Sequence, residues 1–148
     1  MKAIHLNDLS RTFEYTLFSQ NGSLTTNETD GSISVRVYLT INYIKDGNFY
    51  LLTSVSGYWT FLDSGMSVTS SVLIYGCNGL TSDGLSVFNQ NATKYPSNYF
   101  SYNTGFQYYV NQYYGVMDAN LKVNLKQVNP NGTTRTWSFT TYNNLFNS

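Results

Sequence analysis

Tyrosine side chains gather in one short stretch of the sequence, and they are the residues whose types and spacing best suit a chemical role. Nine aromatic residues fall within positions 95–114, with asparagine and glutamine interleaved. Tyrosine rings give rigid contact area with a polar tip, and amide side chains give adaptable hydrogen bonds. Surfaces that bind carbohydrate or protein use this combination, so the segment is a candidate binding site. The alternative interpretation is that about half of these rings cap the core. The rings predicted to contact a ligand are Tyr99, Tyr102, Tyr108, Tyr109, Tyr113 and Tyr114.

Few residues are suited to covalent catalysis. His5 is the only histidine, so a catalytic triad or a Cys–His dyad would have to use it, and a solvated residue near the chain end is the simpler interpretation. Cys77 is the only cysteine, which excludes an internal disulfide and a cysteine-based zinc site. The glycines on either side could leave its thiol accessible in a turn, but free cysteine more often behaves as a small buried hydrophobe.

The carboxylates offer a second enzymatic alternative, because glycoside hydrolysis needs two facing carboxyl groups. Several of them stand beside glycine in turn sequences, where aspartate is favoured for backbone reasons. Residues 27–31 are acidic but do not match a calcium-binding loop. We therefore predict no catalytic residue, no metal ligand and no cofactor. The acidic residues are Asp8, Glu14, Glu28, Asp30, Asp46, Asp63, Asp83 and Asp118.

The length and charge of the chain exclude several classes of protein. A chain of 148 residues is ordinarily one domain, and we assign residues 1–148 to a single domain. It is too apolar and aromatic to be disordered, and it has no run of about 18 apolar residues that would span a membrane as a helix. Its 8 basic and 8 acidic side chains balance, which argues against a nucleic-acid partner, since that affinity comes largely from Lys and Arg.

The polar residues are mostly Asn, Ser, Thr and Tyr, and only 11% of the residues are charged. Ser, Thr and Asn compete with the helix backbone for hydrogen bonds, whereas Thr, Tyr, Phe and Val favour strands. This composition suggests a β-rich protein that is secreted or displayed on the cell surface. Residues 1–8 contain no apolar signal-peptide core, so the expectation of export depends on composition.

Alternation of apolar and polar residues predicts a series of strands. The strongest signal covers residues 33–44, and Asp46-Gly47 after it predicts a hairpin turn into a return strand over 49–62. Gly57, inside that return strand, is expected to mark a bulge or a bend. The other predicted strands are residues 12–19, 66–75, 85–88, 120–128 and 133–141, and residues 22–31 are expected to form the most flexible loop.

The same alternation predicts which side chains face the core. Residues 49–62 would direct Phe49, Leu51, Val55, Trp59 and Phe61 inward. Residues 66–75 would direct Met66, Val68, Val72 and Ile74 inward. In the last two strands the inward residues would be Leu121, Val123, Leu125, Trp137 and Phe139.

Residues 89–115 break the strand pattern. Phe106, Tyr109, Val110 and Tyr113 have helical spacing, which predicts one short helix near 104–114. The rival interpretation is a strand in which Phe106, Tyr108 and Val110 alternate. About seven hairpin-linked strands predict an all-β fold, an antiparallel β-sandwich, with a barrel as the alternative.

Three short motifs carry a resemblance to known proteins. They are Gly-Tyr-Trp-Thr-Phe-Leu-Asp-Ser-Gly at 57–65, Tyr-Gly-Cys-Asn-Gly at 75–79 and Phe-Ser-Tyr-Asn-Thr-Gly-Phe at 100–106. Over about the middle half of its length, the chain resembles small uncharacterised exported proteins of Gram-positive bacteria. The motifs are turn and aromatic signatures, so the resemblance implies export and a non-catalytic role but transfers no functional residue.

Together these features predict a non-catalytic extracellular or cell-surface binding or structural module, with carbohydrate binding through the tyrosine-rich segment. The partner would be a glycan or a protein. A self-assembling surface or appendage subunit is the alternative, because low charge and long uncharged strands suit strand exchange between copies. An enzyme that uses Cys77 or a carboxylate pair is the third hypothesis.

Overall fold

The computed structural model describes residues 19–146, and this part of the chain is all-β. The described residues form nine strands, all paired antiparallel, where the sequence predicted about seven. Their bounds are β1 Ser19–Thr29, β2 Val35–Asp46, β3 Phe49–Phe61, β4 Met66–Thr81, β5 Ser86–Val87, β6 Asn91–Lys94, β7 Phe100–Asn103, β8 Val110–Val128 and β9 Thr134–Asn144. The predicted all-β class is confirmed, and the strand predicted over 12–19 lies outside the described residues except for Ser19, where β1 begins.

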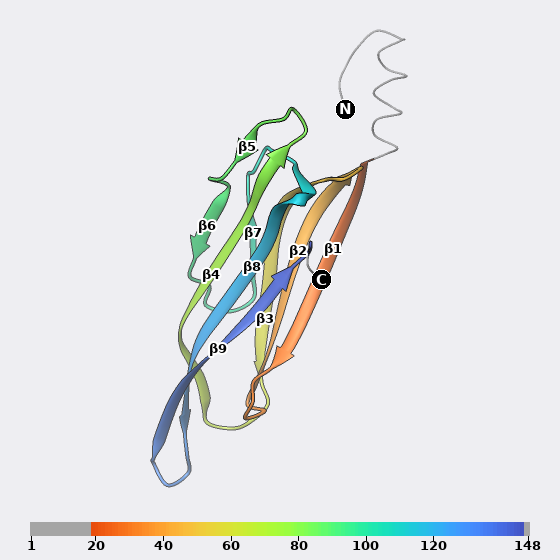
Figure 1. The fold of residues 1–148 in the computed structure, drawn as a ribbon. Helices are drawn as coiled ribbons and strands as arrows, with labels where there is room; N and C mark the ends of the chain where they lie inside the picture. The colour runs from red at the N-terminus through yellow and green to blue at the C-terminus, as the bar shows by residue number, and fades with distance from the viewer. Residues whose placement is uncertain (1–18, 147–148) are drawn as a thin grey trace.

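The strands form one open sheet that divides into two layers (Figure 1). One layer is β1-β2-β3-β7, and the other contains β9-β8-β4 with β5 and β6 at its far edge. Strands β3 and β8 join the layers through two register pairs alone, Phe49 with Asn111 and Tyr50 with Val110. Beyond this junction the two layers separate and enclose the core, which gives the predicted antiparallel β-sandwich.

Alternation over residues 33–44 puts the odd-numbered residues on one apolar face, and this face is the inward one from Val35 on, whereas Ile33 lies before the start of β2 and is 69% exposed. Val35, Val37, Leu39 and Ile41 of β2 are all fully buried, as strict period-two alternation requires. The predicted residues of β8 are also buried, and Met117 and Ala119 extend the same face toward the start of the strand. Trp137 and Phe139 of β9 are half-buried and pack against this core, as predicted.

A bulge in β3 changes which side chains face inward. Residue Thr53 has no partner in the register with β2, since Ser54 pairs with Asn42 and Leu52 pairs with Tyr43. One extra residue moves every earlier side chain to the opposite face. Val55 and Trp59 are buried as predicted, but Tyr50 and Leu52 take the inward positions that were predicted for Phe49 and Leu51. Phe61, the last residue of β3, is 42% exposed although it was predicted to face inward.

A second bulge in β4 has the same effect. Thr69 is the extra residue, between Val68 paired with Leu125 and Ser70 paired with Asn124. Met66 and Val68 pack on the core as predicted, but Val72 and Ile74 do not lie inward, and the side chain of Ile74 is 49% exposed. After the bulge the buried residues include Ser71, Leu73, Tyr75 and Cys77, which lie at alternate positions of the strand. Strand β4 also continues to Thr81, beyond the predicted end.

The helix predicted near 104–114 is wrong, and so is the rival strand over 106–110. Residues 104–109 form neither a helix nor a strand, and β8 begins at Val110. Hydrogen bonds to β3 hold the start of this segment: the Thr104 amide donates to the Thr53 carbonyl at 2.9 Å, and the Thr104 hydroxyl donates to the Leu52 carbonyl at 2.6 Å. These bonds to a neighbouring strand replace the local bonds that a helix needs.

Two further expectations about the backbone are wrong. Residues 22–29, predicted to lie in a flexible loop, belong to β1 and pair with β2. Gly57 is not at a bulge, since it pairs regularly with Leu39 on one side and Phe100 on the other. A Cβ atom at Gly57 would overlap the Tyr38 carbonyl oxygen and would lie 2.8 Å from the Phe100 ring. The glycine is therefore needed for close packing between three strands.

We predict that Gly57→Ala lowers the free energy of unfolding by about 1–3 kcal/mol, the usual cost of overpacking a core. Chemical denaturation measures this loss. Gly31→Ala is the matched control, because a Cβ atom there meets nothing within 4 Å. Equal stability of both variants would contradict the packing described for Gly57.

Asp30 connects the β1–β2 turn to β9. It is 3% exposed, and its carboxylate accepts hydrogen bonds from the Ser34 and Val35 amides at 2.6 and 3.1 Å. It also accepts from the Ser32 hydroxyl at 2.6 Å and from the Trp137 indole N–H at 3.0 Å. Burial alone would raise the pKa of Asp30, but these four donors outweigh it and hold the pKa below its ordinary value of 3.8.

A lowered pKa in the folded state makes this contribution to stability dependent on pH. We predict that the stabilisation by the Asp30 carboxylate is fully present above pH 3.8, the ordinary pKa of the group. It is lost as the pH falls through the lower pKa that Asp30 has in the folded state. Denaturation curves at a series of acidic pH values should show a steeper loss for the native chain than for Asp30→Asn. Parallel curves for the two proteins would contradict the prediction.

Candidate binding surfaces

An open groove lies between the β4–β6 connection and the segment that precedes β8. Its volume is about 490 Å³, and its lining is Leu85, Ser86, Val87, Phe88, Asn89 and Tyr108. Phe88 is 77% exposed and Tyr108 is 49% exposed, so two aromatic rings border the groove and face solvent. No lining residue is charged. The groove is shallow and open to solvent, so it would contact one side of a ligand through apolar rings and a few polar groups.

The side chain of Gln90 fixes the backbone beneath this groove. Its amide nitrogen donates to the carbonyl oxygens of Cys77 at 2.7 Å and Tyr108 at 3.0 Å. Its amide oxygen accepts from the backbone N–H groups of Gln107 and Tyr108, both at 3.1 Å. Gln90 is buried, and these four bonds satisfy its amide. The backbone of Tyr108 is therefore held beside the β5–β6 connection before any ligand binds.

Asn78 of β4 holds the other end of the same connection. Its side-chain oxygen accepts a hydrogen bond from the backbone N–H of Gln90 at 2.8 Å. Its side-chain nitrogen donates to the side-chain oxygen of Asn91 at 2.7 Å. The Asn91 side chain in turn donates to the Phe88 carbonyl at 3.2 Å. Phe88 and Tyr108 are thus positioned through their backbones, and their rings are free to contact a ligand.

A second aromatic surface lies on the outer face of the β1-β2-β3-β7 layer. The rings of Tyr38 and Tyr58 stack with centroids 4.5 Å apart, and those of Tyr58 and Tyr99 stack at 5.0 Å and 3°. Tyr99 ends this row and is 72% exposed, so one face of its ring is open. The neighbouring outward row, Thr40, Ser56 and Ser101, carries only hydroxyl groups.

Asn98 sets the position of Tyr99. Its side-chain oxygen accepts from the Trp59 amide at 3.0 Å and from the Tyr99 amide at 2.8 Å, and its nitrogen donates to the Trp59 carbonyl at 3.2 Å. These bonds hold Tyr99 at a φ of 31°, which non-glycine residues rarely adopt. The strain is therefore offset by the hydrogen bonds to β3.

Tyr113 and Tyr114 are exposed at a third place, where β8 departs from β4. Gly79 pairs with Gly115 and Thr81 pairs with Val110, so four residues of β8 lie opposite one residue of β4. The Asn111 side-chain oxygen accepts from the Tyr113 amide at 2.8 Å and closes this excursion. Both tyrosine side chains are exposed.

The remaining predicted residues, Tyr102 and Tyr109, are half-buried. Tyr102 stacks on Phe100 at 5.6 Å and lies beneath the Lys94 ammonium group at the same distance. Burial and the nearby carboxylate of Asp46 raise the pKa of the Tyr109 hydroxyl. Both rings pack against the protein on one side.

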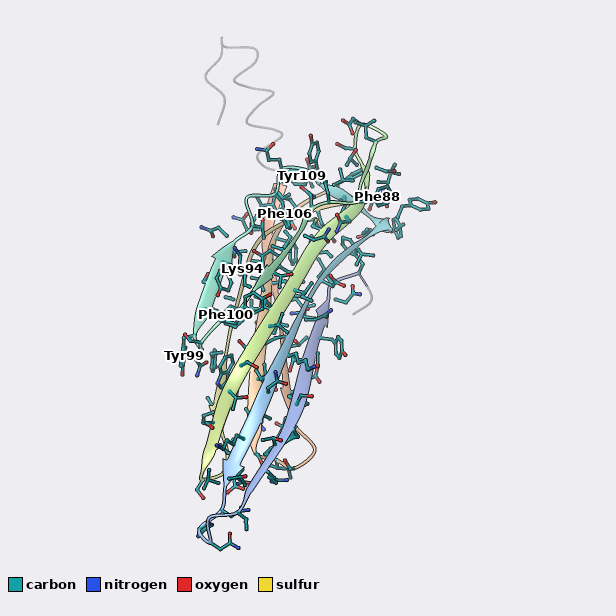
Figure 2. The ribbon with its side chains drawn as sticks, turned by 90° about the vertical axis from the view of Figure 1, so that its left-hand side faces the viewer. Phe88, Lys94, Tyr99, Phe100, Phe106 and Tyr109 are labelled. Carbon is teal, nitrogen blue, oxygen red and sulfur yellow. The ribbon has the colours of Figure 1, made fainter. Side chains whose placement is uncertain are left out.

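The six predicted rings therefore do not form one site. Figure 2 shows two of them, Tyr99 and Tyr109, at well-separated places on the molecule. Sequence reasoning missed Phe88 and Asn89 of the groove, although Phe88 stands at the end of a predicted short strand. It also missed Gln90, for which the sequence offers no signal, and Tyr38 and Tyr58, whose even positions in alternating strands could have indicated the outer face.

Cys77 is fully buried, as expected of a free cysteine that behaves as a small hydrophobe. Its thiol donates to the Tyr50 carbonyl at 3.7 Å, and burial raises its pKa to about 11. Because the thiolate is the nucleophile, this environment opposes reactivity at neutral pH. The hypothesis that Cys77 is an accessible cysteine in a turn is therefore wrong.

We predict that Cys77 in the folded protein does not react with a thiol-specific reagent at neutral pH. The same reagent should label it completely once the chain is unfolded in denaturant. Mass spectrometry of the labelled protein measures both outcomes. Fast labelling without denaturant would show that the thiol is accessible.

Asp63, Asp83 and Asp118 each have a shifted pKa, and each shift has a different cause. A hydrogen bond from the Gln127 side chain lowers the pKa of Asp63, and a hydrogen bond from the Thr81 hydroxyl lowers that of Asp83. Burial raises the pKa of Asp118, but Gly76 and Asn144 are its direct neighbours across the sheet, so no second carboxylate faces it there. Among residues 19–146, no group of three or more His, Cys, Asp or Glu is placed to hold a metal ion.

Comparison of the chain with protein-family models, curated proteins and solved structures finds no match. Within the described residues, no helix has the length and apolar character needed to cross a membrane.

Proposed function

We propose that this protein is a non-catalytic carbohydrate-binding module that acts outside the cell, and that its ligand occupies the groove between Phe88 and Tyr108. The observation that carries the proposal is the groove itself, with two exposed rings on a backbone fixed by Gln90. Aromatic rings suit the apolar faces of a sugar, while Ser86 and Asn89 offer hydrogen bonds to its hydroxyl groups.

The chemistry of the lining favours a neutral sugar. No Lys, Arg, Asp or Glu lines the groove, so it offers no charge that would compensate a sulfate or a carboxylate on the ligand. A volume of about 490 Å³ lies within the usual range for small-ligand sites. A fixed backbone lowers the entropic cost of binding, because little has to be ordered when the ligand arrives.

The extracellular location is part of the same proposal. It is supported by the low content of charged residues and by the abundance of Asn, Ser, Thr and Tyr. A buried cysteine is compatible with an oxidising compartment, because its thiol is shielded.

We predict that the protein binds one or more neutral glycans on a broad polysaccharide and oligosaccharide panel. Phe88→Ala and Tyr108→Ala should each weaken that binding by about tenfold or more, equivalent to about 1.4 kcal/mol, because each removes a stacking face. Both variants should fold, since the hydrogen bonds at these positions come from the backbone.

Tyr142→Ala is the matched control. Tyr142 is an exposed ring of β9, and it lies outside the groove. The Tyr142→Ala variant should therefore leave glycan binding unchanged. Binding that persists in the Phe88→Ala/Tyr108→Ala double variant would move the ligand to another surface, and the variant Tyr99→Ala then tests the tyrosine row. Absence of binding to every neutral glycan would overturn the proposal.

A further inference from the structure

Strand β1 is a long strand at the edge of its layer. It has 11 residues, it pairs with β2 on one side, and no described strand pairs with its other side. Edge strands carry unpaired backbone N–H and C=O groups, which can pair with a strand of another chain. An edge of this length could form a complete intermolecular ladder.

The other edges of the described sheet are short or contacted. Strands β5, β6 and β7 have two, four and four residues. Strand β9 also has 11 residues, and β8 is its one strand partner among the described residues. Its Tyr142 amide donates to the Glu28 carboxylate at 3.5 Å, and its Asn143 side chain donates to the carbonyl oxygens of Leu24 and Leu39 at 2.8 and 2.9 Å, so β9 lies against both β1 and β2. The described sheet therefore has two long edges, β1 and β9. Within the described residues no strand pairs with the outer side of β1, whereas one backbone amide of β9, that of Tyr142, already bonds to Glu28.

Strand β1 has none of the features that ordinarily prevent edge pairing. It contains no proline and no lysine, and its register with β2 runs from Ser19 to Thr29 without a bulge. Its one charged residue, Glu28, accepts a hydrogen bond from β9. The outward side chains of Ser23, Thr25 and Asn27 are uncharged, and Thr25 is fixed by a 2.7 Å hydrogen bond to Thr40 of β2.

The charge of the whole chain permits close approach of identical copies. Its formal net charge is zero, so two copies experience no net repulsion. A twofold axis perpendicular to the sheet would place two β1 strands antiparallel, with the same residues contributed by each copy. The two β1-β2-β3-β7 layers would then form one continuous sheet.

We propose that the partner of the β1 edge is the β1 edge of a second copy of this chain, which makes the protein a dimer with an antiparallel β1–β1 seam. The seam is held by backbone hydrogen bonds, with hydroxyl and amide side chains at the surface above it. This interaction is independent of glycan binding at the groove.

Sedimentation of the full chain over a dilution series tests the proposal. We expect a dimer that dissociates on dilution. The variant Thr25→Lys/Asn27→Lys brings lysines of both copies to the seam, and like charges facing each other across paired strands are destabilising. It should raise the dissociation constant about tenfold or more. Its circular dichroism spectrum and melting curve establish that it is folded.

The variant Thr136→Lys/Ser138→Lys is the control. It adds the same charge to exposed positions of β9, and it should leave the dimer intact. A native chain that is monomeric at every concentration would overturn the proposal. A dimer that resists the β1 lysines, or that responds equally to the β9 lysines, would also overturn it.

Cross-linking gives a second readout that does not depend on affinity. Because Cys77 is buried, a single introduced cysteine supplies the only reactive thiol in the described residues. In the series Ser23→Cys, Thr25→Cys and Asn27→Cys, at least one variant should form a disulfide-linked dimer under mild oxidation. Thr136→Cys should remain unlinked. Equal linkage at β1 and β9 would show random collision and would contradict a defined seam.

Discussion

The long strands of this sandwich must keep one face on a shared core while they twist, and two threonine bulges meet this constraint. Thr53 in β3 and Thr69 in β4 are extra residues, and each hydroxyl donates to an asparagine carbonyl on the paired strand, at 3.0 Å to Asn42 and 3.2 Å to Asn124. A bulge bends its strand and exchanges the two faces. The core residues before and after each bulge depend on this local arrangement.

Uncharged amide side chains form hydrogen bonds to the backbone where regular strand pairing stops. Gln90 and Asn78 hold the connections around β5, Asn98 holds Tyr99 against β3, and Asn111 closes the excursion of β8. In each case a side-chain amide satisfies backbone groups that have no strand partner at that point. The abundance of asparagine therefore has a structural basis at these sites, and the exposed rings are positioned by their backbones.

The sequence predicted the parts of this fold that follow from unbroken alternation. β2 and the second half of β8 have regular registers, so their buried residues could be identified from period two alone. The faces of β3 and β4 were predicted only on one side of each bulge, because Thr53 and Thr69 resemble ordinary strand residues. The helix near 104–114 was predicted from spacing, but the deciding bonds join Thr104 to β3, which is distant in sequence. The groove was missed for the same reason: Gln90 and Tyr108 are brought together by tertiary contacts.

The proposed ligand site and the proposed seam are compatible in space. Strands β5 and β6, beside the groove, and strand β1 lie on opposite sides of the molecule (Figure 1). Pairing through β1 would therefore leave both grooves open. An axis perpendicular to the sheet turns the second copy end for end, so the two grooves of a dimer would lie toward opposite ends. Such a dimer would bridge two separate glycan chains more readily than it would grip one, because simultaneous binding requires ligands that match the separation of the sites.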